Sequence, residues 1–179
     1  MNLPSFSERK LQFIQVISQM TDPEEFSQLE ALSQKYHKKD ESFFWEMIDL
    51  LDWEQSDNEL IIKPLIQVLS QKSLSEIFTF QEYLSQKLFF LDQKRFAQNF
   101  ADQYFSVDTF LYVRACVVAN GKAFYDHICQ NPQEMPSDLT FESLLYVAQK
   151  AYQQQTGQHF MPYLPTVSYE TYSNKIAWL

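Results

Sequence analysis

The chain has 179 residues, of which 45% are hydrophobic and 16% aromatic, a composition that can bury a core and is atypical of a disordered protein. Its net charge of -9 argues against binding to nucleic acid or to anionic membrane surfaces, because no basic patch in the sequence is strong enough to overcome that charge. Sandwiches, barrels and doubly wound sheets need many glycines, whereas this chain has 2 glycines against 7 prolines, and we predict an all-α protein.

The first residues lack the charged start, apolar stretch and cleavage site of a signal peptide. No apolar run approaches the ~18 residues that span a bilayer. We therefore expect a cytoplasmic protein that does not enter the membrane. Cys116 and Cys129 lie among apolar residues and are typical of core thiols in a reducing compartment.

Segments with helical periodicity recur along the chain, separated by residues typical of helix caps. Residues 6–20 predict the first helix. Asp22 and Glu25 form a capping box for the second helix, which ends in the basic run KYHKK. Asp40 is then placed to cap a third helix, so this part of the chain predicts two separate helices.

The middle of the chain continues the same pattern. Pro64 predicts that the next helix starts or kinks there, because a proline cannot donate a backbone hydrogen bond. Ser73 and Glu76 form a second capping box, which begins a helix with an apolar face. Aromatic residues around Phe96 and Phe100 predict a further helical segment.

The two glycines of the chain mark the predicted ends of two later helices. The segment SVDTFLYVRACVVANG predicts a helix that stops at Asn120 and Gly121, and a later helix begins near Phe141 and closes at Gly157. We predict a single helical domain over residues 1–157, built as an irregular bundle of about eight or nine short helices. Residues 158–179 contain two prolines and no helical period and predict an irregular tail, in which Val167 and Tyr169 favour a short strand.

Several motifs together resemble one known family. These motifs are FFWEMI, LSEIFTFQEYL and the pattern D-x-F-x-x-V-R-x-C-V-V-x-N-G-K-x-x-Y, followed by Asn131 and Pro132. Over residues 42–157 the chain resembles the bacterial family catalogued as a domain of unknown function, number 4240. The positions that carry the resemblance are Trp45, Asp108, Phe110, Arg114, Gly121, Tyr125, Thr156 and Gly157. The resemblance implies a helical fold and assigns no activity.

Arg114 is a single charge within an apolar helical segment, and it needs a partner because a buried guanidinium loses its hydration. One interpretation is a structural ion pair with an acid of the same chain. The candidate acids are Asp102, Asp108, Asp126 and Glu142. The other interpretation is a fork for the carboxylate or phosphate of a ligand, oriented by Asp108 and flanked by Tyr112 and Tyr125. The sequence leaves both interpretations open.

A second group of candidate residues is acidic. The run DLLDWEQSDNE contains five acids and no base, and two tryptophans lie in or near it. This group consists of Trp45, Asp49, Asp52, Trp53, Glu54, Asp57 and Glu59. Aromatic anchors beside charges are typical of protein interfaces. The alternatives are a solvated helix end in which Asp57 caps the next helix, and a site for a divalent metal, although the spacing fits no EF-hand loop.

The usual catalytic motifs are missing from the sequence. Two glycines cannot supply a Walker loop, a dinucleotide-binding turn or a nucleophile elbow, and the three histidines are scattered. We predict no catalytic residue, cofactor or metal. We expect non-enzymatic binding of a basic protein partner, as an immunity or antitoxin protein does when it neutralises a basic toxin. The alternative is an enzyme or small-anion sensor that uses a pocket around Arg114.

Overall fold

The computed structural model describes residues 17, 19–100 and 106–179. Contacts divide the chain into two compact units, Met1–Asp40 and Glu41–Leu179. The first predicted helix, over residues 6–20, falls almost entirely outside the described residues. The account below therefore concerns the second unit, except where the second helix begins.

Every regular element in the described ranges is helical, which confirms the all-α prediction there. The α-helices are α2 (Pro23–Ile48), α3 (Asn58–Leu69), α4 (Leu74–Leu91), α5 (Val107–Ala119), α6 (Gly121–Gln130) and α7 (Val147–Thr156). Short 3-10 helices are η1 (Lys94–Phe96), η2 (Gln98–Phe100), η3 (Pro132–Glu134), η4 (Glu142–Tyr146) and η5 (Lys175–Trp178). The sequence predicted eight or nine short helices, whereas the described residues form six α-helices and five short 3-10 helices. No strand forms around residues 167–169, where the sequence favoured one.

The largest difference from the prediction is α2, which is one continuous helix of 26 residues rather than two. Asp22 caps its start as predicted, because its Oδ1 accepts a hydrogen bond of 2.8 Å from the backbone nitrogen of Glu24. Asp40 lies inside the helix and does not begin a new one. The physical reason is that no glycine or proline interrupts the sequence between Pro23 and Ile48.

The predicted caps of α3 and α4 are present. Asp57 caps α3 and accepts a 2.7 Å hydrogen bond from the backbone nitrogen of Glu59. Ser73 and Glu76 form the reciprocal capping box at the start of α4. Pro64 lies inside α3, so the helix does not start there as one form of the prediction had it. Local side-chain chemistry thus sets where these helices begin.

Both glycines adopt the left-handed backbone that their predicted role requires. Gly157 ends α7 with φ of 72°, and Gly121 separates α5 from α6 with φ of 87°. The segment expected to be helical from Phe141 is divided, because its first turns form η4 and only the part from Val147 is α-helical.

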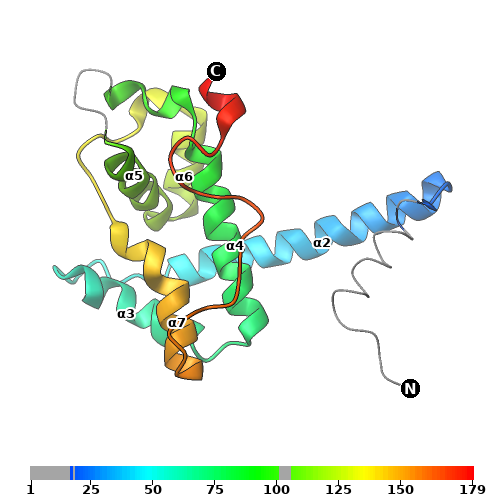
Figure 1. Ribbon diagram of the computed structural model, residues 1–179, viewed down its shortest axis with the longest axis horizontal. Coiled ribbons are helices and arrows are strands. Elements are labelled where there is room, and N and C mark those ends of the chain that lie inside the picture. The colour runs from blue at the N-terminus through cyan, green and yellow to red at the C-terminus, as the bar shows by residue number, and fades with distance from the viewer. Residues whose placement is uncertain (1–16, 18, 101–105) are drawn as a thin grey trace. The chain divides into compact units, whose positions relative to one another are not determined.

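The core of the second unit lies around α4 and α5. Figure 1 shows α4 crossing the middle of this unit, and α4 contacts both α5 and α7. Four phenylalanines are completely buried in this core, namely Phe44, Phe80, Phe96 and Phe110. Aromatic burial on this scale supplies much of the hydrophobic stabilisation of the unit.

Beyond Gly157 the chain has no α-helix and runs beside α4, as the orange to red segment of Figure 1 shows. Its contacts with α4 are both aromatic and polar, and the Tyr163 ring stacks on that of Phe78 with centroids 5.0 Å apart. Glu82 on α4 accepts hydrogen bonds from the Tyr163 hydroxyl at 2.7 Å and from the Thr166 backbone nitrogen at 3.0 Å. The same segment then reaches the buried charges that form the candidate site.

Candidate functional site

Arg114 lies in the middle of α5 and is completely buried, with 0% of its surface exposed. Its Nη1 donates hydrogen bonds to the carbonyl oxygen of Leu88 at 2.8 Å and to that of Tyr169 at 3.0 Å. Its Nη2 donates to the Thr171 hydroxyl at 2.9 Å. The guanidinium carbon lies 4.9 Å from the ring centroid of Phe110. The partners of this buried cation are therefore dipoles and an aromatic ring.

No carboxylate of the described residues lies within 4.0 Å of the guanidinium nitrogens of Arg114. Of the acids proposed from the sequence, Asp102 lies outside the described residues, and the others make no ion pair with Arg114. Burial lowers the pKa of Arg114 to about 10, and the negative charges of Asp92 and Glu170 oppose this shift. The Nε of Arg114 is buried and has no hydrogen-bond partner.

Asp92 is the second buried charge of the site, and the sequence analysis did not identify it. It follows the last residue of α4 and is 0% exposed. Its Oδ1 accepts hydrogen bonds from the backbone nitrogen of Tyr172 at 3.1 Å and from the indole nitrogen of Trp178 at 2.9 Å. Its Oδ2 accepts one from the backbone nitrogen of Asn174 at 2.9 Å. No motif around Asp92 marks it as buried, because its partners lie 80 or more positions away along the chain.

The other residues proposed around Arg114 do not contact its guanidinium through hydrogen bonds. Asp108 is exposed in the first turn of α5. Tyr112 is half-buried, and its carbonyl oxygen accepts a 3.0 Å hydrogen bond from the Phe141 nitrogen. Tyr125 is buried on α6, where its hydroxyl donates to the carbonyl oxygen of Lys87 at 3.4 Å and burial raises the pKa of its phenol. The predicted cluster around Arg114 is therefore replaced by Asp92 and the C-terminal segment.

Trp45 does not belong to an exposed surface, in contrast to the sequence-based prediction. It is 5% exposed, and its ring lies 4.9 Å from that of Phe44 and 5.4 Å from that of Tyr125 between centroids. The Lys87 ammonium lies 5.7 Å from the Trp45 ring centroid and 2.5 Å from a carboxylate oxygen of Glu41. Trp45 is thus a core residue that packs beside an ion pair, and it cannot anchor a partner in this conformation.

Trp53 does lie at the surface. It is 48% exposed, and the inner part of its ring packs against Phe141 with centroids 5.1 Å apart. It belongs to the loop between α2 and α3, in which Asp52 accepts hydrogen bonds from the Glu54 backbone nitrogen at 3.2 Å and from the Gln55 side chain at 3.0 Å. Asp52 therefore stabilises the loop that carries Trp53, and the indole packs against Phe141.

The remaining acids of the run have different surroundings. Asp49 and Glu54 are exposed, and neither forms an ion pair with a base in the part of the chain that the structure describes. Asp57 is exposed but caps α3. Glu59 forms an ion pair with Lys150 on α7. Among the acids of residues 49–59, the exposed carboxylates without a cationic partner among the described residues therefore lie in the loop that carries Trp53.

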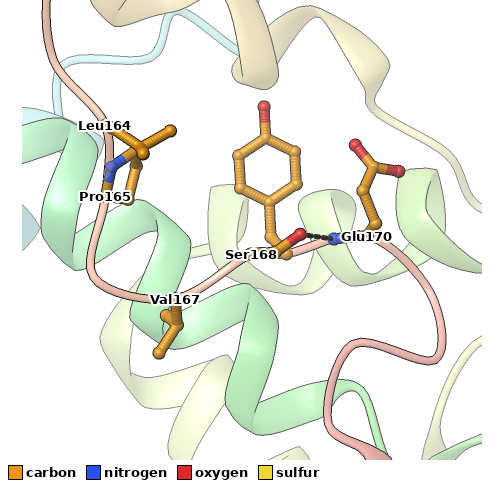
Figure 2. Close-up of a pocket in the computed structure, with 6 residues that line it drawn as sticks. Leu164, Pro165, Val167, Ser168 and Glu170 are labelled. Carbon is orange, nitrogen blue, oxygen red and sulfur yellow. Dashed lines mark hydrogen bonds between the residues drawn. The ribbon is translucent and has the colours of Figure 1, made fainter.

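Two of the hollows on the surface of the second unit are lined by described residues. One, of about 370 Å³, lies between α3 and α7 and is lined by Glu59, Leu60, Lys63, Ile66, Gln67, Lys150 and Gln154. The other, of about 410 Å³, is lined by six residues of the C-terminal segment, and Figure 2 labels Leu164, Pro165, Val167, Ser168 and Glu170 along it. Arg114 lines neither of these two hollows, and its side chain is completely buried.

The described residues were also compared with the requirements of a metal site and of a membrane-spanning helix. Across residues 19–100 and 106–179, no three metal-binding side chains gather closely enough to hold an ion. None of the helices in the described ranges combines the length and apolar character that a membrane crossing requires.

Residues 39–154 match the family described as Protein of unknown function (DUF4240), which covers more than half of the chain. The chain belongs to this family. The matched range confirms the resemblance predicted from the sequence, and it includes Asp92 and Arg114 but ends before the C-terminal segment that binds them. Neither the curated proteins nor the solved structures gave a match.

Proposed function

We propose that the protein binds a basic protein partner without catalysing a reaction, and that it does so through the loop between α2 and α3. We call this region the Trp53 surface and define it by Asp49, Asp52, Trp53, Glu54 and Asp57. The observation that carries the proposal is the half-exposed indole of Trp53, which packs against Phe141 and lies in a stretch of the chain that also carries Asp49, Asp52, Glu54 and Asp57. A fixed aromatic ring is a typical anchor of a protein interface.

The charge of this surface favours a basic partner. Asp49 and Glu54 are exposed without a cationic partner among the described residues, whereas Glu59 is already paired with Lys150. The whole chain carries a net charge of -9, which attracts a positively charged protein and raises its rate of association. A small acidic protein of the cytoplasm that neutralises a basic toxin, as immunity and antitoxin proteins do, would have these properties.

An enzyme or small-anion sensor that uses Arg114 is the alternative function. The unpartnered Nε of Arg114 favours it, because this donor is available to an acceptor of a ligand. However, the two Nη atoms are already bound by the chain itself, and the guanidinium has no access to solvent. A ligand would have to displace the C-terminal segment first, so this alternative has less support than partner binding.

The test is affinity capture with the full chain, followed by binding measurements on the purified complex. The proposal requires a captured basic protein whose affinity falls by at least about tenfold with Trp53→Ala, as for an anchor residue of an interface. Charge reversal by Glu54→Lys should slow association, and the rate for the unaltered protein should fall as salt increases. Phe160→Ala is the matched control, because Phe160 is also an exposed aromatic residue but lies in the C-terminal segment.

Two outcomes would contradict the proposal. A captured partner that binds Trp53→Ala and the unaltered protein equally well does not use this surface. An acidic partner, or association that does not depend on salt, would contradict the role assigned to the carboxylates.

A further inference from the structure

We propose that Asp92 and Arg114 form a peptide-binding site, and that residues 169–178 of the same chain are its resident and displaceable ligand. The two side chains are completely buried and oppositely charged, but they do not form an ion pair with each other. Each one instead binds the C-terminal segment. This site is separate from the Trp53 surface and does not depend on the function proposed for it.

The first argument is the match between charge and hydrogen-bonding groups. Arg114 carries only donors, and the segment offers it two acceptors, the carbonyl oxygen of Tyr169 and the hydroxyl of Thr171. Asp92 carries only acceptors, and the segment offers it donors. These donors are the backbone nitrogens of Tyr172 and Asn174 and the indole nitrogen of Trp178. The order of acceptors followed by donors along the segment thus matches the two charges.

The second argument concerns the shape of the bound segment. Tyr172, the first of the residues that bind Asp92, follows directly after Thr171 and adopts a left-handed backbone with φ of 72°. Residues other than glycine adopt this backbone conformation at an energetic cost. The hydrogen bonds on both sides of Tyr172 must therefore hold its backbone in place. Thr171 is fixed further, because its hydroxyl donates to the carbonyl oxygen of Val107 at 2.7 Å.

The third argument is that the segment has no fully buried residue of its own, although Met161, Tyr169 and Trp178 pack against the core. None of residues 157–179 is buried, in contrast to the helices that they cover. The large apolar side chains most exposed there are Phe160 at 87%, Leu164 at 91%, Ile176 at 86% and Leu179 at 98%. The apolar contacts of residues 169–178 with the core are made by Tyr169 and by Trp178, whose ring lies 5.9 Å from that of Phe110, and we expect the segment to detach while the helices remain folded.

The chemical class of the ligand follows from the groups that are recognised. Three of the five hydrogen bonds that the segment makes to Asp92 and Arg114 come from the backbone, through Tyr169, Tyr172 and Asn174. Backbone groups are common to all peptides, so a peptide supplied in trans can replace the resident segment. The buried Nε of Arg114 remains without a partner, which shows that the resident segment does not use every donor of the site.

The test measures binding of a fluorescent peptide with the sequence of residues 166–179 to the full chain. The host carries Thr171→Val and Trp178→Phe, because these changes weaken its own segment and leave Asp92 and Arg114 intact. We expect the peptide to bind at or below roughly millimolar concentration, the effective concentration of a tethered segment. A scrambled peptide keeps the backbone groups but loses the hydroxyl and the indole at their positions, so it should bind more weakly, and Trp53→Ala in the same host should leave binding unchanged.

Two sets of variants locate the binding. Asp92→Asn or Arg114→Met in the host should each weaken peptide binding by about tenfold or more, as expected when hydrogen bonds to a charged group are lost. A peptide that itself carries Thr171→Val and Trp178→Phe should also bind about tenfold or more weakly to the host in which Asp92 and Arg114 are intact. This second arm does not depend on the folding of the site variants, which circular dichroism would check.

Hydrogen exchange of the unaltered chain tests whether the segment detaches. The amides of Tyr172 and Asn174 should exchange more rapidly than the amides in the core of α4 and α5, because they open without global unfolding. If these amides exchange only when the whole core unfolds, the segment does not detach on its own and is not displaceable. A peptide that fails to bind at roughly millimolar concentration, or binds as well to the Asp92→Asn and Arg114→Met hosts, would overturn the site.

Discussion

Asp92 and Arg114 are both completely buried, and each is compensated by the C-terminal segment instead of by the other. Burial of an ion costs several kcal/mol unless hydrogen bonds replace its hydration. The carbonyl oxygens of Leu88 and Tyr169 do this for the cation, and backbone nitrogens do it for the anion. The irregular tail thus solvates two charges of the helical core.

The first prediction concerns removal of the buried cation. Arg114→Met keeps an unbranched apolar side chain in place, but it leaves the carbonyl oxygen of Leu88 and the hydroxyl of Thr171 without their donor. We expect the free energy of unfolding to fall by about 3 kcal/mol, because buried polar groups lose their partners. Urea unfolding monitored by circular dichroism measures the change.

Arg95 provides the matched control for this prediction. It is exposed, and its guanidinium lies 4.6 Å from the ring centroid of Phe96. Arg95→Met should cost no more than about 1 kcal/mol, the contribution of an exposed cation beside a ring. If both substitutions have equally small effects, the hydrogen bonds of Arg114 do not contribute to stability as we argue.

The sequence was sufficient to predict the features that depend on nearby residues. The caps at Asp22, Asp57 and Ser73 were predicted correctly, because each one binds backbone nitrogens two or three positions away. The turns at Gly121 and Gly157 were also correct, since a left-handed backbone favours glycine. Such local signals are present in any short stretch of sequence.

The sequence was not sufficient to predict the partners of Arg114. Its burial within an apolar segment could be inferred, but Tyr169 and Thr171 bind it from more than fifty positions away. A backbone carbonyl can belong to any residue, so no residue type marks such a partner. The role of Asp92 was missed for the same reason. The assignment of Trp45 to the surface was wrong, because proximity to acids in the sequence does not determine whether a side chain is buried.

A second prediction separates the two roles considered for Asp57. Asp57→Ala removes the acceptor that caps α3 and should lower the free energy of unfolding by about 1 kcal/mol. Asp57→Ser removes the charge but keeps a capping oxygen, so it should retain most of the stability. If Asp57 also steers a basic partner, Asp57→Ser should slow association while unfolding in urea stays nearly unchanged. Equal stabilities of the two variants would show that the cap contributes nothing.

A third prediction uses the left-handed end of α7. Gly157→Ala should lower the free energy of unfolding by about 1 kcal/mol, because φ of 72° is unfavourable for a side chain. No atom lies within 4 Å of the position that an added Cβ would occupy, so the cost is conformational and not steric. Gly157→Asn should cost less than Gly157→Ala, since asparagine tolerates this backbone. Thermal unfolding of both variants would reveal the order, and the reverse order would contradict the backbone argument.

The last prediction is a dependence of stability on pH that arises from Glu82. Burial alone would raise the pKa of Glu82, but hydrogen bonds from Thr166, Tyr163 and Gln86 hold the pKa below its usual value of 4.5. A carboxyl with a lowered pKa in the folded state stabilises the fold above the pKa of the unfolded chain. That contribution is lost as the pH falls through the pKa of the folded state.

Glu82→Gln should therefore lower the free energy of unfolding at neutral pH by about 1 kcal/mol, the typical value of a hydrogen bond, and the difference from the unaltered protein should shrink as the pH falls below 4.5. Urea unfolding from neutral pH to about pH 3 would follow this change. Glu46→Gln, at an exposed position of α2, is the control and should run parallel to the unaltered protein. A difference for Glu82→Gln that stays constant over this range would mean that the charge of Glu82 does not hold Tyr163 and Thr166 against α4.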